Sequence, residues 1–221
     1  MQATLLNSPC ALSTDDLMMS TYIPGDIWIP QGLIRSTVLA STKHARCEVH
    51  KMKTEKGQIK SNWIWLEELS HVCILAHLKV ENKYLLFYQS KYALNSKSYA
   101  PLGGYFEPGE TASDCARREL LEEAGLESEE LLFMGKYRAK GNRGGGFAYF
   151  FLARNSFPSN RTREISDDSE NQEVALFSLP ELVQLVKSGK ILVSPWLAAI
   201  ALGALMELDR QKEQLKPNQL L

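Results

Sequence analysis

The stretch 104–126, GYFEPGETASDCARRELLEEAGL, constrains the fold of this chain more than any other part of its sequence. Thr111 suits the start of a helix, and Asp114 three residues later completes a pair typical of a capping box. Gly125 supplies the left-handed residue at which such a helix ends. The stretch therefore predicts a loop followed by a helix between Thr111 and Gly125.

One side of this helix is predicted to carry acids, and a separate side is predicted to pack on a core. At about 100° per residue, Glu119, Glu122 and Glu123 fall within one narrow arc. A second arc carries the apolar residues Ala116, Leu120, Leu121 and Ala124. Neighbouring carboxylates repel one another, and either Arg118 or a bound divalent cation would relieve that repulsion. A hard ion such as Mg²⁺ takes oxygen ligands and keeps positions for water and phosphates; a solvated acidic face is the alternative.

The spacing within this stretch carries a family resemblance. It reads Gly104, five residues, Glu110, seven residues and then Arg118-Glu119-Leu120-x-Glu122-Glu123-x-Gly125-Leu126. In these residues the chain resembles the Nudix box of the Nudix hydrolases at every defined position. A gapped match of this length argues against a merely solvated acidic face.

The resemblance implies a Nudix fold, which is an α/β/α sandwich with a mixed sheet, and hydrolysis of a nucleoside diphosphate linked to another group X. A diphosphate is anionic and repels nucleophiles, so metal ions must neutralise its charge. Mg²⁺ is the expected cofactor, with Mn²⁺ as a possible substitute. By resemblance, Arg118 orients the acids, and the metal site comprises Glu119, Glu122 and Glu123, Glu110 in support and the carbonyl of Gly103.

A general base is expected on an acidic loop after the box, where ADP-ribose-cleaving relatives carry it. In this chain that loop is EISDDSENQE. Glu170 is the favoured base or additional metal ligand, and Asp168 is the second candidate. A disordered charged loop is the alternative reading of each of these acids.

The remaining sequence predicts three regions. Residues 1–32 form a loose lead-in broken by proline and glycine. Residues 33–68 alternate apolar and polar side chains around a turn at 55–57, which predicts a small antiparallel β-segment. Residues 69–215 form the Nudix domain.

Within that domain, apolar strands surround the box and two helices end the chain. The first helix is expected from Pro180 to about Lys187, after Ser178, and the second from Ser194-Pro195 onwards. Polar connections are expected over 91–100 and 155–171.

Composition and charge limit the class of protein, its binding partners and its compartment. With 221 residues, 44% hydrophobic, and a formal net charge of −1, the chain is predicted to be globular, without an electrostatic basis for bulk nucleic-acid or membrane binding. Uncharged apolar runs stay short of the ~18 residues that span a bilayer, and the N-terminus lacks the features of a signal peptide. Four cysteines without a CxxC pair favour free thiols over disulfides, and a cytoplasmic protein.

Over about 33–208, the resemblance extends to the ADP-ribose/ADP-sugar pyrophosphatase branch. In that branch the N-terminal strands cross to a partner subunit, which implies a homodimer, and an aromatic residue from them stacks on adenine. Trp63 and Trp65 are the candidates, with Trp28 behind them. Residues at i and i+2 face the same side of a strand, so both rings are expected on one surface. Core or dimer packing is the alternative role for each tryptophan.

One segment departs from the branch. Its relatives usually carry a proline-containing loop after the box, whereas this chain has KYRAKGNRGGGF. Arg138, Lys140 and Arg143 are candidates to grip phosphates there, and the glycines would let the backbone approach a ligand. A solvated basic hairpin tip is the alternative. Lys91 and Lys97 are further candidates for the anionic end of the substrate.

Three functions follow from these observations. The favoured one is cleavage of ADP-ribose or an ADP-sugar to AMP and a sugar phosphate. The second is the same chemistry on a dinucleoside polyphosphate, NADH, an inositol pyrophosphate or capped RNA, although no extended basic surface supports RNA binding. The third is a catalytically silent module that senses a nucleotide, against which the intact box argues.

Overall fold

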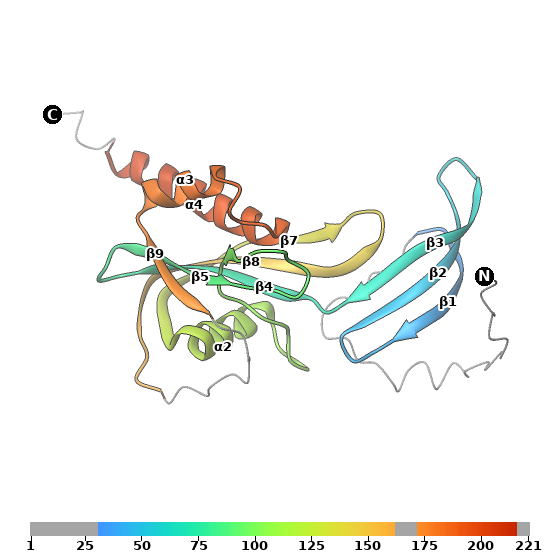
Figure 1. The fold of residues 1–221 in the computed structure, drawn as a ribbon, viewed down its shortest axis with the longest axis horizontal. Coiled ribbons are helices and arrows are strands. Elements are labelled where there is room, and N and C mark those ends of the chain that lie inside the picture. The colour runs from blue at the N-terminus through green and yellow to red at the C-terminus, as the bar shows by residue number, and fades with distance from the viewer. Residues whose placement is uncertain (1–30, 162–171, 216–221) are drawn as a thin grey trace.

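The computed structural model describes residues 31–161 and 172–215, and it folds them around one mixed sheet (Figure 1). The strands run in the order β1-β2-β3-β8-β4-β5-β6, with β7 added to β8 and β9 added to β5. Their bounds are β1 Leu33–Ser41, β2 Ala45–Lys53, β3 Ile59–Glu68, β4 His71–Leu78, β5 Lys83–Gln89, β6 Ser98–Ala100, β7 Leu126–Lys140, β8 Gly144–Pro158 and β9 Glu173–Phe177. The helices are α2 Ala112–Ala124, α3 Leu179–Lys187 and α4 Ser194–Leu215.

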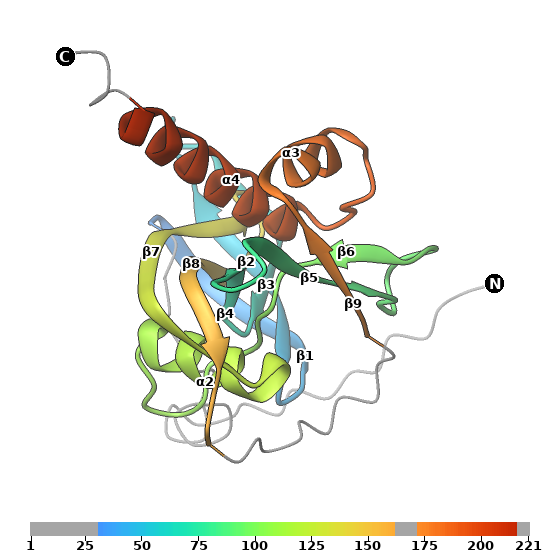
Figure 2. The ribbon, with the colours of Figure 1, turned by 90° about the vertical axis from the view of Figure 1, so that its left-hand side faces the viewer.

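Helices cover both faces of the main part of the sheet, which confirms the predicted α/β/α sandwich. Helix α2 lies against one face, and α3 and α4 lie against the other (Figure 2). Strands β4 and β8 pair in parallel at the centre, while β5, β6, β7 and β9 add antiparallel neighbours. None of the described helices is long and apolar enough to cross a membrane.

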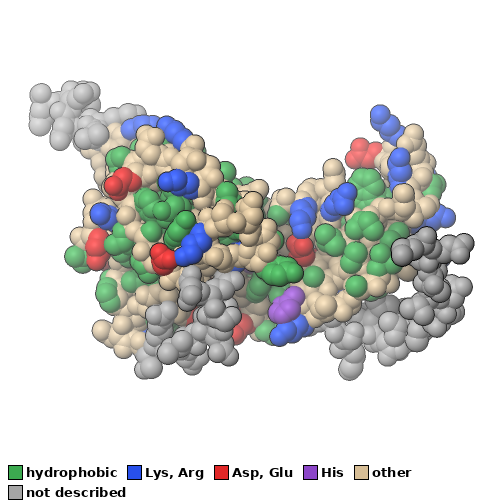
Figure 3. All heavy atoms as spheres, viewed as in Figure 1, with side chains coloured by type: hydrophobic (Ala, Val, Ile, Leu, Met, Phe, Trp, Pro, Cys, Tyr) green, Lys and Arg blue, Asp and Glu red, His purple; other side chains and the backbone are tan. Residues whose placement is uncertain are grey.

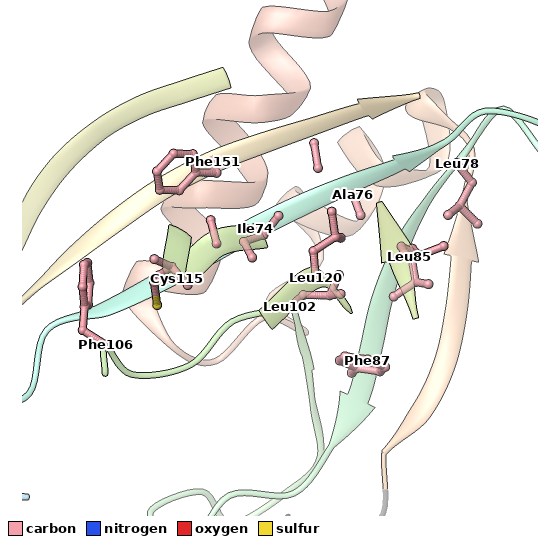
Figure 4. Close-up of a cluster of buried hydrophobic side chains, with 14 residues drawn as sticks. Ile74, Ala76, Leu78, Leu85, Phe87, Leu102, Phe106, Cys115, Leu120 and Phe151 are labelled. Atoms are coloured by element: carbon pink, nitrogen blue, oxygen red, sulfur yellow. The ribbon is translucent and has the colours of Figure 1, made fainter. Parts of the chain in front are cut away.

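The core has a layer on each side of the central strands. Successive residues of β4 point to opposite faces, so Ile74 packs in the layer beneath α2 and Leu75 in the layer beneath α3 and α4. The layer on the α2 side includes Leu102, Leu120 and Phe151 (Figure 4). A strand buried on both faces carries an apolar run without alternation, which is what residues 72–76 show.

The predicted ends of α2 are confirmed. The hydroxyl of Thr111 accepts the backbone N–H of Asp114 at 3.2 Å, and Gly125 ends the helix at φ 65°. The long C-terminal helix begins at Ser194 as expected. Helix α3 begins at Leu179, one residue earlier than expected, and the Glu181 carboxylate accepts the N–H of Ser178 at 2.8 Å.

Strands β1, β2 and β3 form an antiparallel unit, here called the N-terminal lobe, which confirms the predicted N-terminal β-segment. In Figure 1 this lobe stands to one side of the helices. It joins the rest of the sheet where Leu66 on β3 pairs in parallel with Gly144 on β8. There the N–H of Leu66 donates to the carbonyl of Arg143 at 2.8 Å.

Two expected connections are shorter than the sequence suggested. The end of the segment 91–100 forms the short strand β6, because Ser98–Ala100 pairs with the end of β5. Strand β8 continues to Pro158, which pairs with Leu126 on β7, so the second connection begins later than 155. In both places a neighbouring strand, rather than local apolar character, extends the β-structure.

Candidate active site

Arg118, on the middle of α2, gathers three of the predicted acids. Its Nε donates to Glu110 at 2.7 Å, and its Nη1 donates to Glu119 at 2.8 Å and to Glu122 at 2.9 Å. Its Nη2 donates to the backbone carbonyl of Tyr105 at 2.9 Å. One guanidinium therefore joins the loop before α2 to two turns of the helix.

The acids around Arg118 are held in different charge environments. Hydrogen bonding to Arg118 lowers the pKa of Glu110 below its ordinary value. Burial raises the pKa of Glu119, which is 8% exposed, although Arg118 opposes the shift. The hydrogen bonds and charges of these acids, from Glu110 first, raise the pKa of Arg118 in turn. The cluster thus favours the ionised form of Glu110 more strongly than that of Glu119.

Gly104 makes room for the Glu119 carboxylate. A Cβ at residue 104 would lie 2.2 Å from Oε1 and 2.6 Å from Oε2 of Glu119. The carbonyl of Gly104 also accepts the N–H of Val72 at 2.9 Å, which ties this loop to β4. The glycine that opens this motif and an acid fifteen residues later therefore meet in space.

Glu123 lies on another side of the cluster, against the loop before α2. Its Oε2 accepts the backbone N–H of Gly103 at 2.7 Å. Gly103 has φ 150°, and a Cβ there would lie 2.0 Å from the carbonyl oxygen of Val72. Gly103 thus meets Glu123 through its amide, while a metal-binding role of its carbonyl stays a prediction.

A cavity of about 190 Å³, here called the Glu123 cavity, opens beside this carboxylate. Residues from the start of β4, the end of β5, the loop before α2 and the first turn of α4 line it, among them His71, Gln89, Lys91, Tyr105 and Trp196. Lys91, predicted to meet the anionic end of a substrate, therefore lines the same cavity as Glu123 and Gly103.

Sequence reasoning missed the other side chains of the Glu123 cavity. Gln89 precedes Lys91 by two residues, so the same strand spacing that groups Trp63 with Trp65 would have pointed to it. Burial lowers the pKa of His71 below its ordinary value of 6.5. Trp196 carries no local signal, because only the packing of α4 on the sheet brings it to this loop.

The acids suit a divalent cation by chemistry. In 31–161 and 172–215, no group of three or more His, Cys, Asp or Glu side chains converges closely enough to hold a metal ion. The donors present are nonetheless carboxylate oxygens, which hard cations prefer. Glu119 and Glu122 share one guanidinium nitrogen, and Glu123 follows on the same helix. The set that would hold a metal is therefore Glu119, Glu122 and Glu123, with Glu110 beside them.

Trp63 and Trp65 line a different cavity, of about 550 Å³, here called the tryptophan cavity. The indole of Trp63 donates to the carbonyl of Asn142 at 2.7 Å, and the ring of Trp65 stacks on His50 with 5.4 Å between centroids. Both rings face one surface of β3, as the strand spacing predicted. Among the described residues, the two cavities share no lining side chain. Trp63 and Trp65 therefore do not line the Glu123 cavity.

The basic residues after the box lie at the joint between the N-terminal lobe and β8. The guanidinium of Arg138 packs over the ring of Phe147 at 4.0 Å and near that of Trp65 at 5.7 Å. The Nζ of Lys140 pairs with Glu68 at 2.9 Å. None of Arg138, Lys140 and Arg143 lines the Glu123 cavity, so a role for Arg138 and Arg143 in substrate binding stays a prediction.

Two glycines of this hairpin, Gly144 and Gly146, lie directly against other parts of the protein, whereas Gly141 faces open space. A Cβ at Gly144 would lie 2.5 Å from the carbonyl oxygen of Leu66 and 2.7 Å from the ring of Trp65, and a Cβ at Gly146 would lie 2.2 Å from the carbonyl oxygen of Leu69. The expectation that these glycines bring the backbone close to a ligand is therefore corrected at these two positions.

Glu170 and Asp168 lie outside the described residues. Trp28 lies outside them as well. Of the loop EISDDSENQE, Glu173 is described at the start of β9, where it pairs with Lys97. Lys97 lines a separate cavity near α3 rather than the Glu123 cavity.

The α/β/α sandwich thus presents an arginine-held set of acids beside a small cavity that polar and charged side chains help to line. The NUDIX domain model matches residues 69–197, which is more than half of the chain. The chain therefore belongs to the Nudix family and is a Nudix hydrolase. Enzymes of this family generally use divalent metals and act on small nucleotide substrates.

Comparison with solved structures supports the fold. A crystal structure described as an ADP compounds hydrolase matches with a TM-score of 0.64 and 18% sequence identity, over 83% of this chain and 98% of that chain. At this identity the similarity shows the shared fold alone. A search of curated proteins gave no match.

Proposed function

We propose that this Nudix hydrolase cleaves ADP-ribose or an ADP-sugar, with Mg²⁺, to AMP and a sugar phosphate. The observation that carries the proposal is the Glu123 cavity, where Lys91 and Glu123 line one small space. An ammonium group suits a diphosphate oxygen, and an acid beside it suits the metal that the diphosphate requires. The ADP compounds named in the description of the similar structure support the choice of nucleotide.

The acids on α2 and in the loop before it have different proposed roles. Glu119, Glu122 and Glu123 would hold Mg²⁺, or Mn²⁺ in its place, and Glu110 would support them. Mg²⁺, when bound, neutralises charge on the diphosphate and lowers the pKa of a water molecule. Arg118 positions the acids through the hydrogen bonds of its guanidinium, and so acts without touching the substrate.

Hydrolysis adds one water across the diphosphate bridge. The water oxygen bonds to one phosphorus, the bond from that phosphorus to the bridging oxygen breaks, and the water's proton passes to a general base. In this proposal Glu170 is the base, with Asp168 as the second candidate. Lys91 binds the phosphate oxygens and limits the charge that builds on the leaving group.

We also propose a homodimer in which the tryptophan cavity of one chain receives the adenine of a substrate whose diphosphate lies in its partner. Arg138 and Arg143 would contribute to that nucleotide site from the joint. Hydrophobic side chains show on the surface of the N-terminal lobe (Figure 3). The exposed ones in β1 and β3 are Ile34, Val38, Leu39 and Ile59. A second copy covering this lobe would bury them, because exposed apolar patches often mark interfaces.

The same proposal divides the chain into a lead-in at 1–32, an N-terminal lobe at 33–68 and a Nudix domain at 69–215. The family match that begins at residue 69 supports the second boundary. Cys47, Cys73 and Cys115 are free thiols, which supports a reducing compartment such as the cytoplasm.

A substrate panel tests the function. The enzyme with Mg²⁺ is offered ADP-ribose, ADP-glucose, NADH, a diadenosine polyphosphate and an inositol pyrophosphate, and the products are identified. AMP from one of the first two is expected as the fastest product. A clear preference for another compound of the panel would make that compound the proposed substrate. No hydrolysis of any compound, with Mg²⁺ bound, would favour a nucleotide sensor.

The matched variants test the site. Glu123→Gln is expected to lower kcat by about a hundredfold or more, since it removes a charge that stabilises the transition state. Glu81→Gln makes the same change in an exposed turn and should retain wild-type activity. Full activity of Glu123→Gln would remove this residue from the metal site.

A further inference from the structure

Lys97, which the sequence singled out for an anionic ligand, lines a cavity apart from the acids of α2. This cavity, here called the Lys97 cavity, measures about 270 Å³ and lies where the ends of β5 and β6 meet the loop after α3 (Figure 2). Among the described residues, none lines both this cavity and the Glu123 cavity. The proposed diphosphate site therefore leaves the Lys97 cavity without a role.

The wall of the Lys97 cavity carries positive charge and hydrogen-bond donors. Lys97 and Lys190 both line it, together with the exposed Ser96, and none of the described residues along its wall is acidic. A serine hydroxyl and an ammonium group both donate hydrogen bonds, and those from an ammonium to an anion are stronger than neutral ones. This set of groups suits an anion with several acceptor oxygens.

Lys97 has a carboxylate partner that a stronger anion can replace. Its Nζ pairs with Glu173 at the start of β9, and the side chain of Glu173 is 65% exposed. An ion pair this exposed contributes little, because water screens it. A phosphate monoester carries about −1.5 to −2 charges at pH 7 and three acceptor oxygens. It therefore competes with the Glu173 carboxylate for the same ammonium.

The remaining wall is apolar and is held in place by backbone hydrogen bonds. The rings of Tyr88 and Tyr99 pack together with 4.8 Å between centroids, and Leu192, which is 41% exposed, adds an aliphatic side chain. The Ser98 hydroxyl accepts the N–H of Leu192 at 2.9 Å. The N–H of Tyr99 donates to the carbonyl of Lys190 at 3.2 Å. Because these bonds join the two sides of the cavity, binding would require little ordering of the protein.

We propose that the Lys97 cavity is a second ligand site, which binds a phosphate monoester. The phosphate lies on Lys97 and Lys190, and the organic part of the ligand lies against the apolar wall. Nucleoside monophosphates and sugar phosphates both have this chemistry, and both are products of the proposed function. The site does not rest on that function, because it binds without the acids of α2 and without a metal.

Titration calorimetry in EDTA tests this site apart from the metal-dependent one. The ligands are AMP, ribose 5-phosphate and inorganic phosphate, and wild type is expected to bind at least one of the two esters more tightly than inorganic phosphate. Lys97→Met and Lys190→Met should each weaken that binding about fivefold or more, since each removes a charged donor. Lys43→Met removes a charge from the exposed bend between β1 and β2 and should bind as wild type does.

Glu173→Gln gives an expected change of the opposite sign. Loss of this carboxylate releases the ammonium of Lys97 and should tighten binding about twofold or more. A general disturbance of the wall would weaken binding in every variant. Weaker binding in Lys97→Met together with tighter binding in Glu173→Gln therefore identifies competition for the Lys97 ammonium.

Four results would overturn the proposal. They are no binding of either ester by wild type, unchanged binding in both Lys97→Met and Lys190→Met, binding of inorganic phosphate as tight as that of both esters, and a loss of binding in Lys91→Met instead, which would place the phosphate in the Glu123 cavity. The tighter of AMP and ribose 5-phosphate identifies the source of the phosphate. Failure to cleave any substrate with Mg²⁺ would overturn the proposed function alone, because calorimetry in EDTA measures no turnover.

Discussion

Arg118 donates to three carboxylates and to the carbonyl of Tyr105, each within 3.0 Å. The planar fork of a guanidinium can satisfy acceptors in several directions at once, whereas an ammonium is a point charge on a flexible stem. At the scale of a single residue, the guanidinium of Arg118 therefore offsets the repulsion between these acids. A divalent cation placed among the same acids would relieve the same repulsion.

Arg118→Lys is therefore expected to destabilise the protein most when no metal is present. Loss of the fork leaves the buried Glu119 carboxylate without its donor, at a cost of about 1–3 kcal/mol. Thermal unfolding in EDTA and in Mg²⁺ measures the effect: Mg²⁺ should raise the Tm of the variant more than that of wild type. Arg117→Lys changes the exposed neighbour on α2 and should behave as wild type. An equal rise in Tm for all three proteins would contradict this account.

At the scale of elements, the loop before α2 and the helix itself fit together through two adjacent glycines with different requirements. At Gly103 a side chain would meet the backbone of β4, and φ is positive. At Gly104 the three nearest atoms to such a side chain would all belong to the Glu119 carboxylate. Gly103 is therefore required for the fold, whereas Gly104 is required for the position of the Glu119 carboxylate.

The two alanine variants should separate these roles. Gly104→Ala is expected to retain a Tm near that of wild type while losing about a hundredfold in kcat, the order of loss for a misplaced catalytic group. Gly103→Ala is expected to lower the stability by more than about 1 kcal/mol, because alanine is strained at positive φ. Thermal unfolding and steady-state kinetics on both proteins provide the comparison. A large loss of Tm in Gly104→Ala would show that its Cβ displaces backbone rather than Glu119.

The limits of sequence reasoning follow the range of the interactions. The ends of α2 were predicted correctly, because Thr111, Asp114 and Gly125 act within one or two turns. Strand β6 was missed because its pairing with β5, rather than its own residues, makes it a strand. The burial of the Gln89 Oε1, which has no hydrogen-bond partner among the described residues, was equally invisible, because burial is a property of the assembled sheet.

At the scale of the whole molecule, the N-terminal lobe and the acids of α2 carry separate cavities. Sequence reasoning placed Trp63 and Trp65 on one surface of a strand, but it could not show how far that surface lies from the acids. The contact between Trp65 and Gly144 joins residues far apart in the chain, and no local pattern predicts it. A single site that uses both cavities is therefore the arrangement that the proposed homodimer would provide.

Mixed dimers test that requirement. A chain with Glu123→Gln and a chain with both Trp63→Ala and Trp65→Ala are expected to be weakly active alone. Co-expressed and purified through two different tags, the mixed dimer should regain activity, because one of its two sites then has intact acids from one chain and intact tryptophans from the other. If a preparation shown to be dimeric is no more active than the two variants alone, both tryptophans serve packing within one chain rather than the partner's site.

The contact between the β7–β8 hairpin and β3 also bears on how such chains diverge. Surface loops ordinarily gain and lose residues freely during evolution. This hairpin meets β3 through the carbonyls of Asn142 and Arg143, which accept from the Trp63 indole and the Leu66 amide. A single inserted or deleted residue would turn its side chains to the opposite face and withdraw both carbonyls. Descendants that keep the N-terminal strands are therefore expected to keep the length of this hairpin, even where its residues have drifted.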